Sequence, residues 1–346
     1  MSASRPLLSV CIPTFNRSAL LSRSLQSVYD ECPSDRVEII VLDNASSDKT
    51  AQVVEQAQQA DPRIQYVKND VNLGLDGNII KAIATASGDY VFLFSDDDVL
   101  LPGSGAAVLS AIESFTPSLL YLDHAGVWDD EDPRTVLTQR SGSHAENDIY
   151  ADGFSFLYDL LLEHNSALVF LASAAQIATK VLPAYERQGF ERGYAGSAIA
   201  YQVVLEAKGP FVRVGHCCVA VRNSLDISYN PVYSSHLDPV RQYKMLRSRG
   251  LLTRAQLSKL MRKRIWGVRD NLILALRCAK DPRYSAVERR LIWKEGWRYW
   301  RFYVYLAPIV TLPRWILCPM YRLGQHVLRT YERSRGIQRR VLGKTP

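Results

Sequence analysis

The sequence predicts an α/β protein with a mostly parallel sheet, followed by a basic region that is mainly helical. Two observations predict the sheet: short apolar runs alternate with longer helical patterns through residues 1–122, and polar clusters follow several of these runs. Strands that alternate with helices are typical of a parallel sheet covered by helices on both faces. With 346 residues, of which 47% are hydrophobic, the chain is long enough for one large α/β domain and a further region.

The first part of the chain is predicted to alternate regularly between strands and helices. Its predicted strands comprise residues 7–12, 37–42, 64–68, 90–94 and 119–122. Its predicted helices comprise residues 17–29, a segment capped by Ser46 or Ser47, residues 76–86 and residues 103–114. Asp48 lies in the predicted first turn of the second helix, where a carboxylate complements the helix dipole.

Beyond residue 122 the predicted elements are less regular. Residues 125–150 are polar and rich in turn-forming residues, which predicts a loop or a hairpin. Further predicted elements are helices at 152–164, 174–182 and 194–208, and strands at 167–171 and 211–214. A change of composition near Asp238 predicts two regions: a domain of residues 1–238, with halves 1–122 and 123–238, and a basic helical region of residues 239–346.

The two regions carry opposite charge. Residues 241–346 hold 26 of the 42 lysines and arginines and 5 of the 35 acidic residues, a net charge of +21. Residues 1–240 therefore have a net charge of −14. Such asymmetry predicts that the two regions meet different partners.

The cysteines and the N-terminus indicate a cytoplasmic location. The six cysteines form no CxxC pair and no zinc-type spacing, which favours a reducing compartment. The apolar run at residues 7–12 is short and meets Pro13, so it is not typical of a signal peptide.

An acidic triplet, Asp96–Asp98, follows the apolar run Tyr90–Phe94 and Ser95. Such a run predicts a strand buried on both faces, so three carboxylates would gather at the edge of a sheet. A divalent metal that holds a phosphate-bearing ligand, Mg²⁺ or Mn²⁺, is the natural counter-charge. The alternative is a solvated loop or a helix cap before Leu101 and Pro102.

Other polar clusters follow the first three predicted strands. They are Pro13–Arg17, Asp43–Asn44 and Asn72–Gly74. Ligands of parallel sheets bind at the carboxyl ends of the strands. We therefore expect these clusters and the acidic triplet to form one binding site, although each cluster alone is compatible with turn chemistry.

These clusters belong to four ordered motifs, Ser9–Arg17, Val41–Thr50, Asn72–Asn78 and Ala86–Asp98. As a set they resemble the family 2 glycosyltransferases of the GT-A fold, and among them the abequosyltransferase-like group. The resemblance implies a Rossmann-like nucleotide-diphospho-sugar transferase fold and a nucleoside diphosphate sugar as donor. It covers about the first 120 residues and is looser beyond residue 125.

The resemblance also implies roles for individual residues. Residues expected to form the nucleoside pocket are Pro13, Thr14, Phe15, Arg17, Asp43, Asn72 and Gly74, with Asp43 accepting hydrogen bonds from the base. Asp97 and Asp98 match the acidic pair of the family, of which one carboxylate faces the ribose or sugar and the other the metal. Because Ser95 replaces the commoner aspartate, it stays open which carboxylate contacts the metal. Asp96 and Asp97 are the candidates for nucleotide binding, and Asp97 and Asp98 are the candidates for metal binding.

Physical chemistry supports the same reaction. Breaking the bond between a sugar and a diphosphate develops negative charge on the leaving phosphate, which a divalent cation neutralises as a Lewis acid. Arg222 is predicted to add a second cation by bidentate contact. Its alternative is an ordinary surface arginine after a strand.

The general base for the acceptor hydroxyl is a separate question. Inverting relatives supply an aspartate at the start of a helix, but here that start reads Gly196-Ser197-Ala198. The candidate bases are Glu191 and His164. Their alternatives are an exposed loop glutamate and a structural imidazole.

Residues 297–322 mix aromatic residues with arginines. A bilayer-spanning helix needs about 20 mainly apolar residues, and Arg314 and three prolines interrupt this run. The composition favours a membrane interface, with residues 297–346 attached to the inner face of the cell membrane. The alternative is a helical bundle with its arginines in solvent. Nucleic-acid binding is not expected, because no RNA or DNA motif accompanies the basic region.

Together these features predict a metal-dependent, inverting glycosyltransferase of bacterial surface polysaccharide synthesis, such as O-antigen or capsule. Its acceptor would be a glycan or polyprenyl-linked glycan hydroxyl. Two alternatives remain: a sugar nucleotidyltransferase, and an inactive sugar-nucleotide-binding or scaffold protein.

Overall fold

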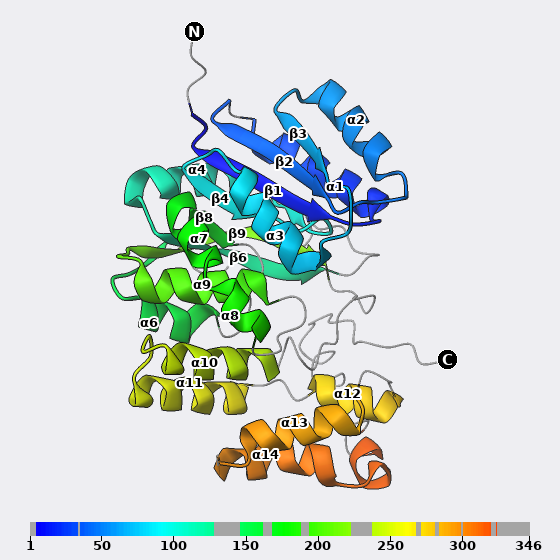
Figure 1. Cartoon of the computed structure of the whole chain (residues 1–346), viewed down its shortest axis with the longest axis vertical. Helices are drawn as coiled ribbons and strands as arrows, with labels where there is room; N and C mark the ends of the chain where they lie inside the picture. Colours follow the sequence, from blue (N-terminus) through cyan, green and yellow to red (C-terminus); the bar gives the residue numbers. More distant parts are fainter. Residues whose placement is uncertain are drawn as a thin grey trace. The chain divides into compact units, whose positions relative to one another are not determined.

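The computed structural model describes residues 5–33, 35–127, 146–161, 168–187, 194–222, 237–267, 271–280, 284–298, 300–319 and 323. By its internal contacts the chain divides into two compact units, residues 1–229 and residues 230–346. The first unit holds the sheet, and the helices of the second are numbered α10 to α14 (Figure 1).

The described part of the N-terminal unit is built around one nine-stranded sheet (Figure 1). The strand order is β3 (Ile64–Lys68), β2 (Val37–Asp43), β1 (Leu8–Thr14), β4 (Tyr90–Leu93), β8 (Leu168–Leu171), β6 (Leu119–Val127), β9 (Phe211–Arg222) and β5 (Val99–Leu100). A short strand, β7 (Asp148–Tyr150), pairs with β9.

Strands β1 to β4 are parallel, which brings their carboxyl ends to one edge of the sheet. β1 lies between β2 and β4, and β2 also pairs with β3. In this register Thr14 lies opposite Asp43, and Asp43 lies opposite Lys68. The edge that carries the polar clusters is therefore set by strand pairing, and the predicted α/β sheet fold is confirmed.

The sheet is more mixed than the sequence indicated. β8 runs antiparallel to both of its neighbours, β4 and β6, and β5 and β7 run antiparallel to β9. A fully buried strand has the same apolar pattern in either direction, so its direction depends on the connection that precedes it. β6 also continues through residue 122, where the predicted halves of the domain were divided.

Helices pack on the sheet in two groups. On one side α1 (Ser18–Glu31) contacts α2 (Thr50–Ala60) and α4 (Ser104–Phe115). On the other side α3 (Gly74–Thr85) contacts α7 (Ala172–Thr179) and α9 (Ala195–Glu206), which lie in front of the sheet in Figure 1. Among the described residues of this unit, the remaining helical segments are α6 (Gly153–Phe156), the π-helical η1 (Leu157–Leu161) and α8 (Leu182–Arg187).

The predicted start of α2 was wrong by about one turn. The helix begins at Thr50, and neither Ser46 nor Ser47 caps it. The Ser46 hydroxyl instead accepts a hydrogen bond from the backbone N–H of Asn16 at 2.9 Å. Asp48 Oδ1 accepts from the Thr50 N–H at 3.0 Å, so the carboxylate does serve the helix start.

A buried carboxylate holds the other end of the sheet together. Glu38 of β2 is only 8% exposed. Its Oε1 accepts hydrogen bonds from the hydroxyls of Ser9 (2.5 Å) and Ser87 (2.9 Å) and from the Ser87 N–H (2.7 Å). Gln65 of β3 donates to Oε2 at 3.0 Å. One side chain thus joins three strands to the turn before β4.

Replacing Glu38 with alanine should lower the free energy of unfolding by about 3 kcal/mol, because several buried donors lose their acceptor. Glu38→Gln keeps one oxygen and should cost less. Chemical denaturation with urea measures both effects. Glu55→Ala, on the exposed face of α2, is the control, with an expected change within about 0.5 kcal/mol. A Glu38→Ala protein as stable as this control would contradict the network.

The C-terminal unit is helical where it is described. Its helices are α10 (Asp238–Ser248), α11 (Arg254–Gly267), α12 (Asn271–Ala279), α13 (Ala286–Gly296) and α14 (Trp300–Thr311). α11 contacts α10 and α14, and α13 contacts α14. Among the described residues no helix has both the length and the apolar character to cross a bilayer.

One feature of this unit goes against the expectation, drawn from the cysteine spacing, that all six cysteines are reduced. Cys278 and Cys318 form a disulfide, with their Cα atoms 5.6 Å apart. The two residues are 40 positions apart and belong to no recognisable cysteine motif, so only the fold brings them together. Cys11, Cys32 and Cys218 are buried free thiols.

Candidate active site

The expected convergence of polar clusters at one edge of the sheet is confirmed. Thr14, the last residue of β1, donates its hydroxyl to Asp96 Oδ2 at 2.7 Å. The Thr14 carbonyl accepts from the backbone N–H of Asn44, just after β2, at 2.9 Å. The ends of β1, β2 and β4 are therefore joined directly, with polar groups from all three side by side.

Arg17 neutralises part of the acidic triplet. Its Nη1 lies 3.0 Å from Asp96 Oδ1 and 3.2 Å from Asp97 Oδ2. Burial raises the pKa of Asp96, and the Arg17 charge opposes this shift. Burial lowers the pKa of Arg17, but the negative charges of Asp96 and Asp97 outweigh it and raise the pKa. The Ser95 hydroxyl contacts the other oxygen of Asp97 at 2.5 Å.

Arg222, from the distant strand β9, completes this cluster. It is the last residue of β9, which extends eight residues beyond the predicted end at 214. Its backbone N–H donates to Asp98 Oδ1 at 3.0 Å, and its Nη1 lies 3.9 Å from Asp97 Oδ2. The structure thus places Arg222 beside the acidic triplet, where the sequence predicted a second cation.

Of the three carboxylates of the triplet, Asp98 is the one for which no ion pair with a described arginine or lysine is found. Burial, and then the nearby charge of Asp97, raise its pKa to about 7, although the Arg222 N–H opposes the shift. Its Oδ2 accepts no hydrogen bond from any described residue, whereas both oxygens of Asp96 and of Asp97 have partners. A cation placed against Asp98 would relieve this cost of burial.

The carboxylates of this cluster supply only some of the ligands that a divalent cation needs. Within the described ranges, no three His, Cys, Asp or Glu side chains are grouped so as to hold a metal ion by themselves. Asp98 offers one hard carboxylate oxygen, and Mg²⁺ is commonly bound by one or two carboxylates together with substrate phosphates. The residues therefore suit a cation that a diphosphate helps to hold, rather than a metal bound by protein alone.

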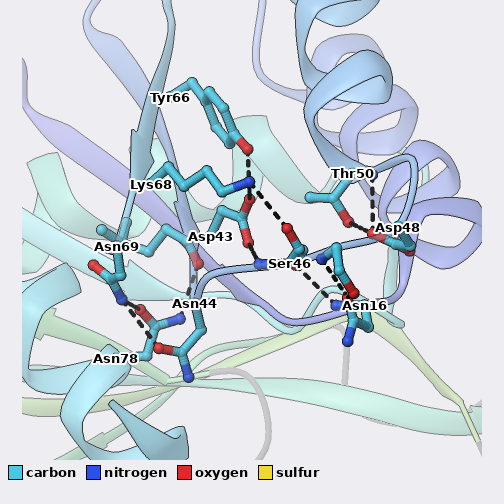
Figure 2. Close-up of polar contacts among 12 residues, drawn as sticks. Asn16, Asp43, Asn44, Ser46, Asp48, Thr50, Tyr66, Lys68, Asn69 and Asn78 are labelled. Carbon is cyan, nitrogen blue, oxygen red and sulfur yellow. Dashed lines mark hydrogen bonds and ion pairs between the residues drawn. The ribbon is translucent and has the colours of Figure 1, made fainter. Parts of the chain in front are cut away.

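Asp43 occupies the centre of a second polar cluster, shown in Figure 2. The side chain is fully buried at the end of β2. Oδ1 accepts from the Ser46 N–H at 2.8 Å, and Oδ2 accepts from the Tyr66 hydroxyl at 2.5 Å. The Lys68 Nζ lies 3.8 Å from Oδ2 and donates to the Ser46 carbonyl at 2.9 Å. These contacts hold the carboxylate in one orientation.

A set of asparagines fixes the loop before α3. The Asn44 amide donates to Asn72 Oδ1 at 2.8 Å and to the Gly74 carbonyl at 3.1 Å. Asn69 donates to Asn44 at 3.1 Å and to Asn78 at 2.9 Å, as Figure 2 shows. Gly74 has a φ of +75°, a conformation that glycine adopts without strain. Asn72 and Gly74 are thereby tied to the end of β2.

Several residues of the site were not identified from the sequence. Tyr66 and Lys68 of β3 were assigned only to a strand, although their alternation placed both on one face of it. The start of α9 has no carboxylate of its own, but Asp76 of α3 reaches it, and Asp76 Oδ1 accepts from the Ala195 N–H at 2.8 Å. Only the packing of α3 against α9 reveals this contact.

The structure describes only some of the remaining predicted site residues. Pro13 is half-buried in β1, and Phe15 is an exposed aromatic directly after it. The candidate bases Glu191 and His164 lie outside the described residues. Their role stays a prediction.

Comparison with known proteins identifies a family that resembles the part of the chain carrying this site. A family model described as glycosyl transferase family 2 matches residues 9–158, which include β1 to β4 and the acidic triplet. Residues 9–158 are therefore similar to glycosyl transferase family 2. The matched residues include Arg17, Asp43 and Asp98, whereas Arg222 lies outside them.

Curated relatives match about 100 residues of the chain. Over 100 residues the chain is 43% identical to the GalNAc(5)-diNAcBac-PP-undecaprenol beta-1,3-glucosyltransferase of Campylobacter jejuni, covering 29% of this chain and 32% of the relative. Over 110 residues it is 36% identical to the abequosyltransferase RfbV of Salmonella typhimurium, covering 31% and 33%. The matches thus span about a third of each relative's length.

Solved structures show the same fold over most of the chain. TarS 1–349 of S. aureus, in complex with UDP-GlcNAc, has a TM-score of 0.61 at 15% identity, covering 92% of each chain. The mannosyltransferase PcManGT of Pyrobaculum calidifontis, in complex with GDP-Man and Mn²⁺, has a TM-score of 0.51 at 16% identity, covering 92% of this chain and 87% of that one. The predicted GT-A fold is confirmed.

Proposed function

We propose that this protein is a glycosyltransferase that moves a sugar from a nucleoside diphosphate donor to a hydroxyl of a glycan or lipid-linked glycan. The observation that carries the proposal is the single polar edge at which Thr14, Asp43 and Asp96–Asp98 meet within the residues that match the family 2 model. The Campylobacter and Salmonella relatives, named as a glucosyltransferase with an undecaprenol-linked substrate and an abequosyltransferase, support a role in surface polysaccharide synthesis.

The cluster around Asp43 is the proposed nucleoside site. Asp43 is held rigidly by Ser46 and Tyr66 and has lone pairs left for a further N–H donor, but because its side chain is fully buried, a base that bonds to it would have to displace a neighbouring side chain. Pro13, Thr14 and Phe15 lie at the adjacent strand end, with the exposed Phe15 ring available to stack on the base. Asn72 and Gly74, tied to Asn44, form the opposite wall.

The acidic triplet and the two arginines are the proposed diphosphate site. Asp96 and Asp97 orient Arg17, and Arg222 lies beside Asp97, so two guanidinium groups lie next to the proposed phosphate position. Asp98, with Asp97 beside it, would hold Mg²⁺ or Mn²⁺, which supplies Lewis-acid stabilisation of the leaving diphosphate when bound. The Mn²⁺ in the complex of PcManGT is consistent with this assignment.

The proposed transfer is inverting: the acceptor oxygen attacks the anomeric carbon from the side opposite the diphosphate. A general base must then remove the proton of the acceptor hydroxyl. Glu191 and His164 remain our candidates for this base. The positive groups at Arg17 and Arg222 stabilise the departing diphosphate, while burial of the site limits competition from water.

The location that follows from this proposal is the cytoplasmic face of the cell membrane, where a lipid-linked acceptor is presented. Residues 297–346 would attach the protein peripherally to that face.

Product analysis with a panel of nucleoside diphosphate sugars tests the proposal. Incubation with Mn²⁺ and an undecaprenyl-linked glycan should release a nucleoside diphosphate and lengthen the glycan by one sugar. Release of pyrophosphate would instead show a nucleotidyltransferase, which attacks at phosphorus. Donor binding without turnover on any acceptor would support the inactive binding protein.

A further inference from the structure

α14 exposes large apolar side chains to solvent. Phe302, Leu306 and Val310 form the buried stripe of this helix, and Phe302 packs against Trp293 of α13 with ring centroids 4.8 Å apart. Val304 on the other side is about half exposed, and so is Tyr303, whose ring lies 6.0 Å from that of Trp293 and 5.5 Å from that of Phe302. A surface helix normally presents polar residues to water, yet Arg301 is the one charged residue between Trp300 and Thr311.

Further large apolar residues are exposed in the segments just before and after this helix. We define the aromatic face as Trp297, Tyr303, Val304, Leu312 and Trp315, which are large, exposed and close in sequence. Trp315, in the helical segment 314–319, is 77% exposed. Burial of large apolar and aromatic side chains is strongly favourable. These exposed residues therefore indicate a site that binds an apolar partner.

The backbone beneath Trp315 is held firmly in place. The Arg277 guanidinium donates to the carbonyls of Ile309 and Leu312 at the end of α14, the latter at 3.0 Å. Arg314 donates to the Cys278 carbonyl at 2.7 Å, and the Cys278–Cys318 disulfide ties the same segment to α12. The backbone around Trp315 is thus held in place by these contacts while its side chain stays exposed.

The charge around this face favours one class of partner. Arg298 stacks on Trp297, with its Cζ 5.1 Å from the ring centroid. Between residues 284 and 298 both acids are engaged, Glu288 in the α13 capping box and Glu295 with Lys244. No described ion pair neutralises the exposed cations Arg289, Arg290, Lys294 and Arg298. Their charge complements an anionic surface, as does the net +21 of residues 241–346.

We infer that the aromatic face inserts into the headgroup region of an anionic phospholipid bilayer, with Trp315 as its principal anchor. α14 has 12 residues, fewer than the roughly 20 of a spanning helix, so it lies in the plane of the interface. Aromatic rings that combine an apolar body with a polar tip are favoured at that depth. The inference deepens the peripheral attachment proposed above by naming the surface and the lipid chemistry.

Vesicle sedimentation with the full chain tests this inference and requires no sugar transfer. At low salt the protein should bind vesicles of phosphatidylcholine with phosphatidylglycerol, and much less to phosphatidylcholine alone. Trp315→Ala should weaken partitioning about tenfold. Tyr29→Ala removes an exposed aromatic of α1 in the N-terminal unit and is the matched control, with binding unchanged. Unchanged thermal unfolding of both variants would show that the fold is retained.

Fluorescence gives a second readout that does not depend on comparing affinities. Brominated lipids should quench tryptophan emission of the unmodified protein, and Trp315→Phe should reduce that quenching while keeping binding, with the remainder coming from Trp297. Absence of binding to anionic vesicles, equal binding to neutral ones, or a Trp315→Ala protein that binds like the unmodified chain would each overturn the inference. A mass that doubles with concentration and depends on Trp315 would assign the face to a second copy. Because donor and acceptor are absent, failure here leaves the transferase proposal standing.

Discussion

Replacing Asp98 with alanine should reduce sugar transfer about a thousandfold. Asp98 is buried, its pKa is raised to about 7, and one of its oxygens accepts no hydrogen bond from the described residues. It is therefore the carboxylate best placed to share a cation with a diphosphate. Removing it should take away the stabilisation of the leaving group while the nucleoside site around Asp43 stays intact.

Two measurements separate this effect from a loss of structure. Mn²⁺ should strengthen nucleoside diphosphate binding by the unmodified protein in calorimetry, and this enhancement should vanish in Asp98→Ala while metal-free binding persists. Asp89→Ala is the matched control, because Asp89 lies just before the other end of β4 and pairs with Arg5 at the surface. Its activity should stay within about twofold. Transfer by Asp98→Ala at an undiminished rate would refute the metal assignment.

Replacing Arg17 with alanine should lower the free energy of unfolding by about 2–3 kcal/mol. Breaking a fully buried ion pair by removing one partner costs about 3–5 kcal/mol, because a charge is left buried without compensation. The expected loss is smaller here because the Arg17 side chain is 31% exposed, whereas that of Asp96 is 6% exposed. Urea denaturation at neutral pH measures the loss directly.

A double-mutant cycle tests the cause of that loss. If the uncompensated Asp96 charge is responsible, Asp96→Asn should recover much of the stability in the Arg17→Ala background, although it destabilises the unmodified protein. Arg17→Lys should keep the charge but lose part of the two-carboxylate contact. Equal and additive losses from Arg17→Ala and Asp96→Asn would show that the ion pair does not couple the two residues.

Much of the fold was predictable because its signals are local. The runs Leu8–Thr14, Val37–Asp43 and Tyr90–Leu93 are apolar along nearly their whole length, which is the pattern of strands buried on both faces. Their helices follow at regular intervals. Because parallel neighbours share an edge, the sequence also predicted that Thr14, Asp43 and Asp96–Asp98 lie close together.

Other features were not predictable because they depend on contacts between distant residues. Nothing local in β3 marks Tyr66 as a partner of Asp43, since that contact follows from the β2–β3 register. The approach of Asp76 to the start of α9 likewise follows from helix packing. The α2 cap was misassigned because Ser46 bonds to Asn16, which comes from another strand end.

By itself the sequence determined the α/β class, the order of the first four strands and helices, and the acidic and basic character of the two regions. Periodicity, composition and turn residues are properties of short segments, so they can be read without coordinates. Tertiary structure alone decided the reversal of β8, the reach of β9 that brings Arg222 to Asp97 and Asp98, and the Cys278–Cys318 disulfide. Each of these joins residues far apart in the chain, and only the packed core determines which distant groups become neighbours.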